Sequence, residues 1–248
     1  MSHRSRIFLV VSVAVWWSMT GGPAAAQTWR DILGAATEQT EPKAEEPQPV
    51  DSVEAGYALK EALLLSAENA VADASRVDGF LANDDIRISL PPKLEVGRET
   101  LTRFGSGSEG DGLELAMNRA AEGAAAEALP LLRDAIRDVL IDDPLATLGA
   151  GGSAATETLR TAAGDALLEG LTPIISSNMN QAGVAGAYDR LVQKGGSLVT
   201  QTVVDREDLT PYVAGRTLDG LFTLIGEGES AIRTDPAAVS YTHLRAHE

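Results

Sequence analysis

The chain has 248 residues, of which 36 are acidic and 20 are basic, so its formal net charge at pH 7 is −16. A negative field of this size repels phosphate backbones and anionic lipid surfaces, so neither nucleic acid nor a charged membrane surface is an expected partner. Cysteine is absent and the three histidines are His3, His243 and His247, which excludes thiol catalysis and argues against a Ser-His-Asp triad or a His/Cys zinc site inside the domain.

Residues 1–26 are predicted to be a cleaved secretory signal peptide. Arg4 and Arg6 give a basic start, residues 7–17 are apolar, and three alanines precede a cut between Ala26 and Gln27. The alternative is an uncleaved anchor, but the apolar run is shorter than the roughly 20 residues that a bilayer span requires. We therefore expect a periplasmic or secreted protein with no transmembrane span after signal cleavage.

Residues 27–50 are predicted to form a short helix and then a disordered linker. Trp29, Ile32 and Leu33 have the spacing of one apolar helix face. Residues 37–49 contain three prolines and four glutamates and almost no apolar side chain, so they cannot bury enough surface to become ordered.

The first helix of the domain is predicted to begin at Asp51, because Asp51 and Glu54 form a capping-box pattern. Its apolar stripe includes Val53 and Tyr57, and the Asp78-Gly79 pair is expected to end it. Phe80 and Leu81 should then return to the core.

Residues 86–90 alternate apolar and polar side chains, which is typical of an extended segment. A single strand lacks a partner, so we expect a strap across the helices. Pairing with a second extended piece at 198–204 is the alternative. A helix is predicted at 94–104.

The longest helical pattern covers residues 113–140, and the other helices are expected to pack around it. Asp111 and Glu114 should cap its start, which leaves residues 105–112 as a flexible glycine-rich connection. That connection lacks the Lys-Ser or Lys-Thr of a phosphate-binding loop and the spacing of an EF-hand. Pro130 should kink or restart the helix, since an internal proline costs about 3 kcal/mol. Leu140 belongs to the predicted buried stripe, whereas Asp134 and Asp138 should lie on the solvated side.

Helical patterns continue to the end of the domain. Asp143 and Pro144 should begin a short helix. Ser153 should cap a helix that ends at Leu171, and Pro173 should start another. The remaining expected features are a helix at 184–192, a break at Gly195-Gly196 and a last helix opening at Thr210-Pro211. Residues 51–239 are thus predicted to form an all-α, compact multi-helix domain with one or two short extended segments.

Several short stretches, found in order, resemble a family of exported bacterial proteins known as domain of unknown function 4197. They are DGFL (78–81), IRISLP (86–91), NRAAE (118–122) with the proline and apolar-DAI segment that follow, AYDRLV (187–192), LDGLF (218–222) and AIRTDP (231–236). The resemblance covers roughly residues 52–238. It implies an exported helical protein and implies no activity.

The last nine residues, 240–248, do not fit this pattern. The resemblance leads us to expect an apolar, lysine-containing helix end there, so SYTHLRAHE is an atypical tail, and it is either native or an artefact. His243 and His247 are four residues apart, but no glutamate follows His243 and no third ligand is evident, so no metal site is predicted.

Polar side chains beside the alanine stripe of the central helix form the one candidate site. The candidate residues are Asn118, Arg119 and Glu122, with Arg87, Asp219 and Arg233 as side chains that could pair with them. One interpretation is a polar pocket or partner contact, and the other is a satisfied buried network or a solvated face. No catalytic, cofactor-binding or metal-ligating residue is predicted. Adjacent acids such as Asp84-Asp85 and Asp142-Asp143 are typical of caps and turns.

The leading functional hypothesis is an exported cell-envelope protein that acts as a non-enzymatic binding or scaffold module without a cofactor. Its partner would be an envelope protein or a small ligand. One alternative is a carboxylate-dependent hydrolase, which requires a concave site with two acids. The other is a carrier of a small apolar ligand between helices.

Overall fold

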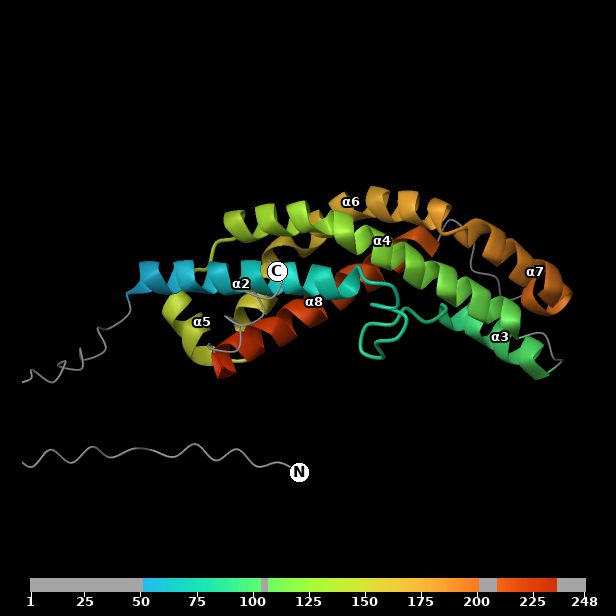
Figure 1. Ribbon diagram of the computed structural model, residues 1–248, viewed down its shortest axis with the longest axis horizontal. Coiled ribbons are helices and arrows are strands. Elements are labelled where there is room, and N and C mark those ends of the chain that lie inside the picture. The colour runs from blue at the N-terminus through green and yellow to red at the C-terminus, as the bar shows by residue number, and fades with distance from the viewer. Residues whose placement is uncertain (1–50, 104–106, 201–208, 236–248) are drawn as a thin grey trace, which may run out of the picture. The chain divides into compact units, whose positions relative to one another are not determined.

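The computed structural model describes residues 51–103, 107–200 and 209–235, without the side chains of 197–200. The predicted signal peptide, N-terminal helix, linker and C-terminal tail lie outside these residues. Seven α-helices and no strand occur in the described ranges, which confirms the all-α fold (Figure 1). The helices are α2 (Ser52–Ala74), α3 (Pro92–Arg103), α4 (Ser108–Asp138), α5 (Pro144–Ala150), α6 (Ala154–Gln181), α7 (Val184–Thr200) and α8 (Leu209–Thr234).

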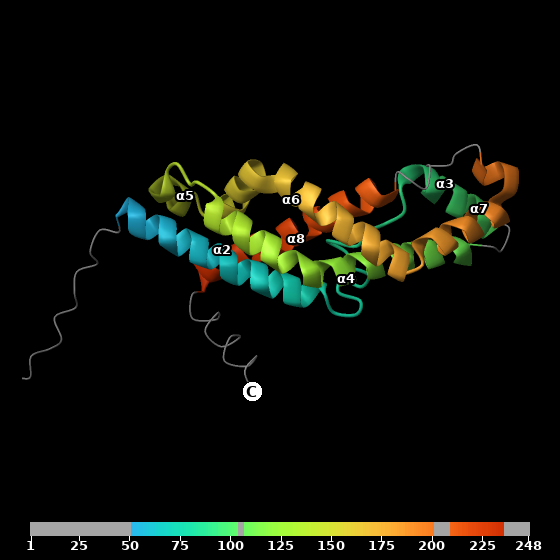
Figure 2. The ribbon, with the colours of Figure 1, turned by 90° about the horizontal axis from the view of Figure 1, so that it is seen from above.

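Helix α4 is the centre of the packing, as the sequence predicts. It contacts α2, α3, α6, α7 and α8. Helix α5 and the start of α2 lie together at one end of the bundle, whereas α3 and α7 lie together at the other (Figures 1 and 2).

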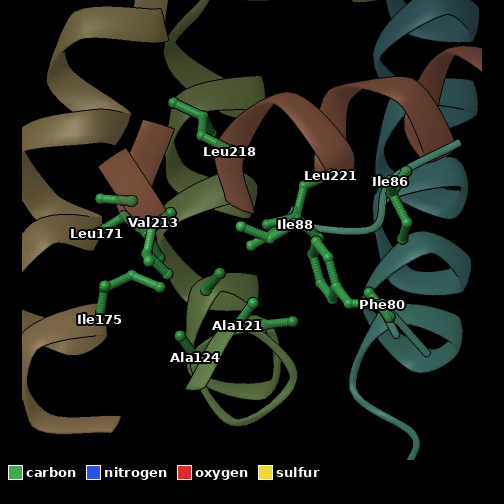
Figure 3. Packing of buried hydrophobic residues seen from close by; sticks show 14 of the residues in the cluster. Phe80, Ile86, Ile88, Ala121, Ala124, Leu171, Ile175, Val213, Leu218 and Leu221 are labelled. Atoms are coloured by element: carbon green, nitrogen blue, oxygen red, sulfur yellow. The ribbon is translucent and has the colours of Figure 1, made fainter. Parts of the chain in front are cut away.

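The core of the bundle forms around the alanine-rich stripe of α4. Ala120, Ala121 and Ala124 are fully buried, and their small side chains let neighbouring helices approach closely. Figure 3 shows Ala121 and Ala124 between Leu171 and Ile175 of α6 on one side and Phe80 on the other. None of the described helices is long and apolar enough to cross a bilayer.

Both internal prolines lie within uninterrupted helices. A restart at Pro130, one of the two predicted alternatives there, is therefore wrong, and so is the predicted break between Leu171 and Pro173. The two prolines are exposed, so water can satisfy the carbonyl that each leaves without a donor. Buried side chains on both sides of each proline, such as Leu171 and Ile175, hold the helix against its neighbours. Burial of one such side chain contributes about 1.5–3 kcal/mol, so a few of them outweigh the cost of the proline.

Helix α4 begins earlier than predicted, at Ser108, so residues 108–112 are helical and Asp111 is not its cap. Asp111 instead accepts a hydrogen bond from Arg98 Nη1 of α3 at 3.1 Å. Arg98 also donates to Glu95, and the hydrogen bonds to these two carboxylates, that to Glu95 foremost, raise the pKa of Arg98 above its usual value. Helix α3 begins at Pro92, two residues before the predicted start.

The other caps follow the sequence more closely. Asp51 accepts from the Glu54 amide at 2.8 Å, and Asp143 accepts from the Ala146 amide at 2.9 Å, with Pro144 in the first turn of α5. Both predictions are confirmed. Ser153 occupies the position before α6, but its side chain makes no capping bond there.

We predict that Asp143→Ala lowers the free energy of unfolding by about 1 kcal/mol, because the first turn of α5 loses its side-chain acceptor. Asp142→Ala is the matched control, since Asp142 is also exposed and caps no helix. Urea denaturation measures both changes, and an equal effect of the two substitutions would contradict the assignment.

Two glycine-containing segments differ from expectation. Helix α2 ends at Ala74, four residues before the predicted stop, and Asp78 adopts a left-handed conformation with φ 66°. Helix α7 passes through Gly195, and a kink at Gly196 (φ 47°) replaces the predicted break. Residues 198–200 are helical, so an extended segment beginning at 198 is wrong, and the rest of that prediction lies outside the described residues.

Candidate functional site

Residues 80–91, hereafter called the strap, form the second part of the connection between α2 and α3, and they contain residues 86–90, the segment predicted to lie as a strap across the helices. Phe80 is fully buried, and the alternation within the strap is confirmed because Ile86 and Ile88 are buried whereas Arg87 is exposed. Figure 3 shows Phe80, Ile86 and Ile88 close to Leu221 of α8. The strap therefore contributes apolar side chains to the core without belonging to a sheet.

Asn118 of α4 is the side chain that pairs with the strap. It is 0% exposed. Its Oδ1 accepts from the Ile88 amide at 2.9 Å, and its Nδ2 donates to the Ile88 carbonyl at 2.8 Å. The same nitrogen donates to the Glu114 carbonyl. One amide side chain thus does for Ile88 what a neighbouring strand would otherwise do.

Glu122, one helical turn further along α4, holds the beginning of the strap. Its Oε1 accepts from the amides of Phe80 and Leu81, each at 3.3 Å. Arg119 donates to Glu122 and also to Asp78, at 2.6 Å. These hydrogen bonds, that to Glu122 foremost, raise the pKa of Arg119.

The strap is also fixed through its exposed side. Arg87 Nε donates to the buried carboxylate of Glu114 at 2.7 Å. The hydroxyl of Tyr212 on α8 donates to the Ser89 carbonyl at 2.9 Å, and burial raises the pKa of Tyr212. Of the six predicted residues, Arg87, Asn118, Arg119 and Glu122 therefore gather along one side of α4.

The other two predicted residues lie elsewhere. Asp219 of α8 accepts from Arg160 Nη1 at 3.0 Å, and the guanidinium of Arg160 lies 4.4 Å from the centroid of the Phe222 ring. Arg233 pairs with Glu229 on α8 and donates to carbonyls of α5, at 2.8 Å for Leu148. The structure therefore does not join Asp219 or Arg233 to the polar side of α4.

Glu229 is a structural residue that the sequence analysis missed. It is 1% exposed, and its carboxylate accepts from the amides of Ala155 and Thr156 and from the Thr156 hydroxyl. A residue 73 positions away thus caps α6 in place of Ser153. Nothing in the local sequence reveals this role, since the partner is brought there by the tertiary fold.

These polar side chains form their hydrogen bonds with other groups of the same chain. Within the described ranges, the Ser66 hydroxyl is the only buried side-chain oxygen or nitrogen without a hydrogen-bond partner. No cluster of three His, Cys, Asp or Glu side chains suited to a metal ion occurs in the same ranges. The contacts of Asn118 and Glu122 hold the strap, and those of Glu229 hold the end of α6.

A surface groove between the second half of α4 and the middle of α6, hereafter the α4–α6 groove, offers space for a ligand. Its volume is about 550 Å³. The lining residues are Leu131, Asp134, Ala135, Asp138, Val139, Leu140, Asp142, Ala162, Ala163, Ala166 and Leu167. Eight of these are apolar and three are aspartates, so the groove combines an apolar surface with acidic side chains. Its size falls within the roughly 300–1,000 Å³ typical of ligand sites.

Exposed apolar side chains concentrate at the same end of the bundle. Eight large hydrophobic residues are exposed in the described ranges. Five of them lie either in the first part of α2 or in the segment that runs from the end of α4 through α5. These five are Val53, Tyr57, Leu140, Leu145 and Leu148. The segments are in contact, since α2 packs against α5 and Lys60 Nζ donates to the Arg137 carbonyl of α4. Such gathering is typical of interaction sites.

Several of these residues differ from their predicted burial or surroundings. Leu140 is 81% exposed rather than buried, and Val53 and Tyr57 are exposed as well. Asp134 and Asp138 are exposed, as expected, but they border the groove rather than a featureless solvated face. Two features of the sequence could have indicated this groove. They are the four-residue spacing of Asp134, Asp138 and Asp142 and the alanines at 162, 163 and 166 of α6.

Comparison with known proteins identifies one family. No curated protein and no solved structure matches the chain. The sequence profile of the family described as "Protein of unknown function (DUF4197)" matches residues 49–246, which is most of the chain. The chain therefore belongs to the DUF4197 family.

Proposed function

We propose that this protein is a non-enzymatic binding module of the bacterial cell envelope, and that it holds its partner in the α4–α6 groove. The observation that carries the proposal is this largely apolar groove, whose lining includes Leu140, one of five exposed large apolar side chains at the same end of the bundle. Water contact at such a surface is unfavourable, and a partner that covers it would gain free energy in proportion to the apolar area. The signal-peptide pattern of residues 1–26 supports the envelope location.

The polar side of α4 is a weaker choice for a binding site. Asn118 and Glu122 already use their oxygens and nitrogens to bind the strap. A ligand that took these groups would have to displace backbone partners that are themselves buried, which costs about 1–3 kcal/mol for each group left unsatisfied. The groove requires no such displacement.

The test is site-specific photo-crosslinking in cells. A photoreactive amino acid with a long, flexible aliphatic side chain, which can extend out of the groove instead of filling it as tryptophan would, is placed at Ala166, which lines the groove. In a second strain it is placed at Ala72, an exposed alanine on α2 that does not line the groove. We expect a defined crosslinked protein from Ala166 and none from Ala72, with mass spectrometry identifying the product. The same products from both positions would contradict the proposal.

The variant Leu140→Gln provides a second readout of the same experiment. We predict that it lowers the crosslink yield at Ala166 several-fold, because a neutral polar side chain replaces an apolar one in the groove lining. Val77→Gln is the matched control, since Val77 is 79% exposed against 81% for Leu140 and lies outside the groove. An unchanged yield with Leu140→Gln would argue against the groove as the binding surface.

A carrier of a small apolar ligand is the second candidate, and the groove volume of about 550 Å³ favours it. This function predicts that protein purified from cells retains a small molecule, visible by native mass spectrometry as an added mass. Ala166→Trp should remove that mass by filling the groove. Protein of the unmodified mass would leave the protein-binding function as the better proposal.

A further inference from the structure

We propose that the occupant of the α4–α6 groove is an amphipathic, positively charged helix of a partner protein. This inference rests on the proposed binding function and adds the chemistry of the partner. It depends on three properties of the groove, which are its length, its apolar lining and its charge.

The residues that line the groove on the α4 side follow the spacing of one helix face. Leu131, Asp134, Ala135 and Asp138 follow one another at positions i, i+3, i+4 and i+7 of α4, so they lie on one face of that helix. Along α6, the facing residues run from Ala162 to Leu167. The α4 face spans about 10 Å, or two helical turns, and a third helix laid along it would present its own apolar residues at the same spacing.

The α6 wall permits a close approach. Ala162, Ala163 and Ala166 have the smallest apolar side chain, so a helix that packs there can reach the interaxial distance of about 8–10 Å seen between packed helices. Leu131 of α4 and Leu140, two residues beyond the end of α4, then provide larger apolar contacts on the opposite side. The lining is therefore suited to a helix that carries a stripe of large apolar residues.

The negative charge of the groove favours a partner with positive charge. Asp134, Asp138 and Asp142 line the groove, and among the residues that the structure describes no basic side chain does. Asp134 forms an ion pair with Arg137 at 3.3 Å, but both side chains are well exposed and such pairs are weak. Asp138 and Asp142 have no basic partner within the described ranges. Lysine or arginine beside the apolar stripe of the partner would complement these carboxylates.

The same charges disfavour two other occupants. A second copy of this chain, with a net charge of −16, would bring further negative charge to an acidic surface. An anionic lipid surface would be repelled in the same way. The apolar and acidic lining therefore favours a basic protein segment.

Fluorescence anisotropy with two synthetic peptides tests the inference on the full mature chain. Both peptides are fourteen-residue helices with leucine at i, i+3, i+4 and i+7, and the remaining positions are lysine in one and glutamate in the other. We expect the lysine peptide to bind at least roughly tenfold more tightly than the glutamate peptide, with an affinity that falls as salt rises. Equal binding of the two peptides would overturn the inference.

Matched variants separate groove binding from general attraction to an acidic protein. Asp138→Asn with Asp142→Asn should weaken binding of the lysine peptide and reduce its salt dependence. Asp84→Asn with Asp85→Asn removes the same charge from exposed positions of the strap and should have little effect. Ala166→Trp should weaken binding by roughly tenfold because it fills the groove. Circular dichroism verifies that each variant is folded.

Equal losses from the two asparagine pairs, or unchanged binding to Ala166→Trp, would overturn the inference. The in-cell crosslink from Ala166 distinguishes this failure from a failure of the proposed function. A crosslink that persists while the lysine peptide neither binds nor competes would retain the binding module and reject the cationic helix. Absence of both would reject the two proposals together.

Discussion

Replacement of Glu229 by alanine is expected to lower the free energy of unfolding by about 3–5 kcal/mol, the range measured when one partner of a buried ion pair is removed. The Glu229 carboxylate is 1% exposed and accepts from two amides at the start of α6. It also pairs with Arg233, which is 16% exposed as a side chain. The substitution therefore leaves a largely buried cation and two amides without their acceptor. Urea denaturation followed by circular dichroism measures the change.

Two further variants identify the source of the loss. Glu229→Ala combined with Arg233→Met should recover part of the stability, because the unpaired cation is removed along with the carboxylate. Glu227→Ala, on the same helix at an exposed position, should change the free energy of unfolding by no more than about 0.5 kcal/mol. A double variant no more stable than the single one would show that the ion pair is not the main contribution.

Helix caps show which parts of the fold the sequence can predict. Asp51 and Asp143 cap helices through amides three residues away, so a short sequence pattern contains the whole interaction. The cap of α6 comes from Glu229, and no local pattern can contain a contact of that range. Ser153 has the residue type and position of a cap and still lacks the bond. Local rules therefore predict local caps and fail where tertiary packing brings a better acceptor.

Prolines and exposed leucines show a second limit of predicting the fold from the sequence. Proline predicts a helix end because its cost is intrinsic, but α4 and α6 continue past Pro130 and Pro173 since the buried residues on either side outweigh that cost. Periodicity assigned Leu140 to a buried stripe, although no neighbouring helix covers that position. Whether an apolar side chain at the edge of a stripe is buried depends on where the next helix lies.

The sequence was enough to single out the candidate polar residues of α4, but not to predict which groups they bind. Asn118 and Glu122 attract attention because they interrupt an alanine-rich stripe that must pack closely. Their partners are backbone groups of Ile88 and Phe80, whose identity does not depend on side-chain type. A sequence pattern does not indicate which backbone group a side chain binds, so the role of these residues could be identified only from the fold. The same residues explain why the extended strap needs no second strand.

Asn118→Leu is expected to lower the free energy of unfolding by about 2–4 kcal/mol. Leucine has a similar shape but cannot hydrogen-bond, so the amide and the carbonyl of Ile88 both lose their partner. Each buried group left unsatisfied costs about 1–3 kcal/mol, and Asn118 itself is 0% exposed, so water cannot replace it without rearrangement. Asn83→Ala is the control, because Asn83 accepts from Asp85 at an exposed turn and should cost about 1 kcal/mol or less.

Hydrogen exchange shows whether the strap is the part that is lost. In Asn118→Leu, the Ile88 amide should exchange faster than in the parent protein under conditions where the amides of α4 stay protected, as expected for local opening. Because Phe80, Ile86 and Ile88 are buried in the shared core, opening of the strap would expose apolar surface of α8 and α2 before global unfolding. Unchanged protection of Ile88 despite a lower free energy of unfolding would place the cost in the packing around α4. Faster exchange confined to the strap would establish that one amide side chain supplies the pairing that a sheet gives an ordinary strand.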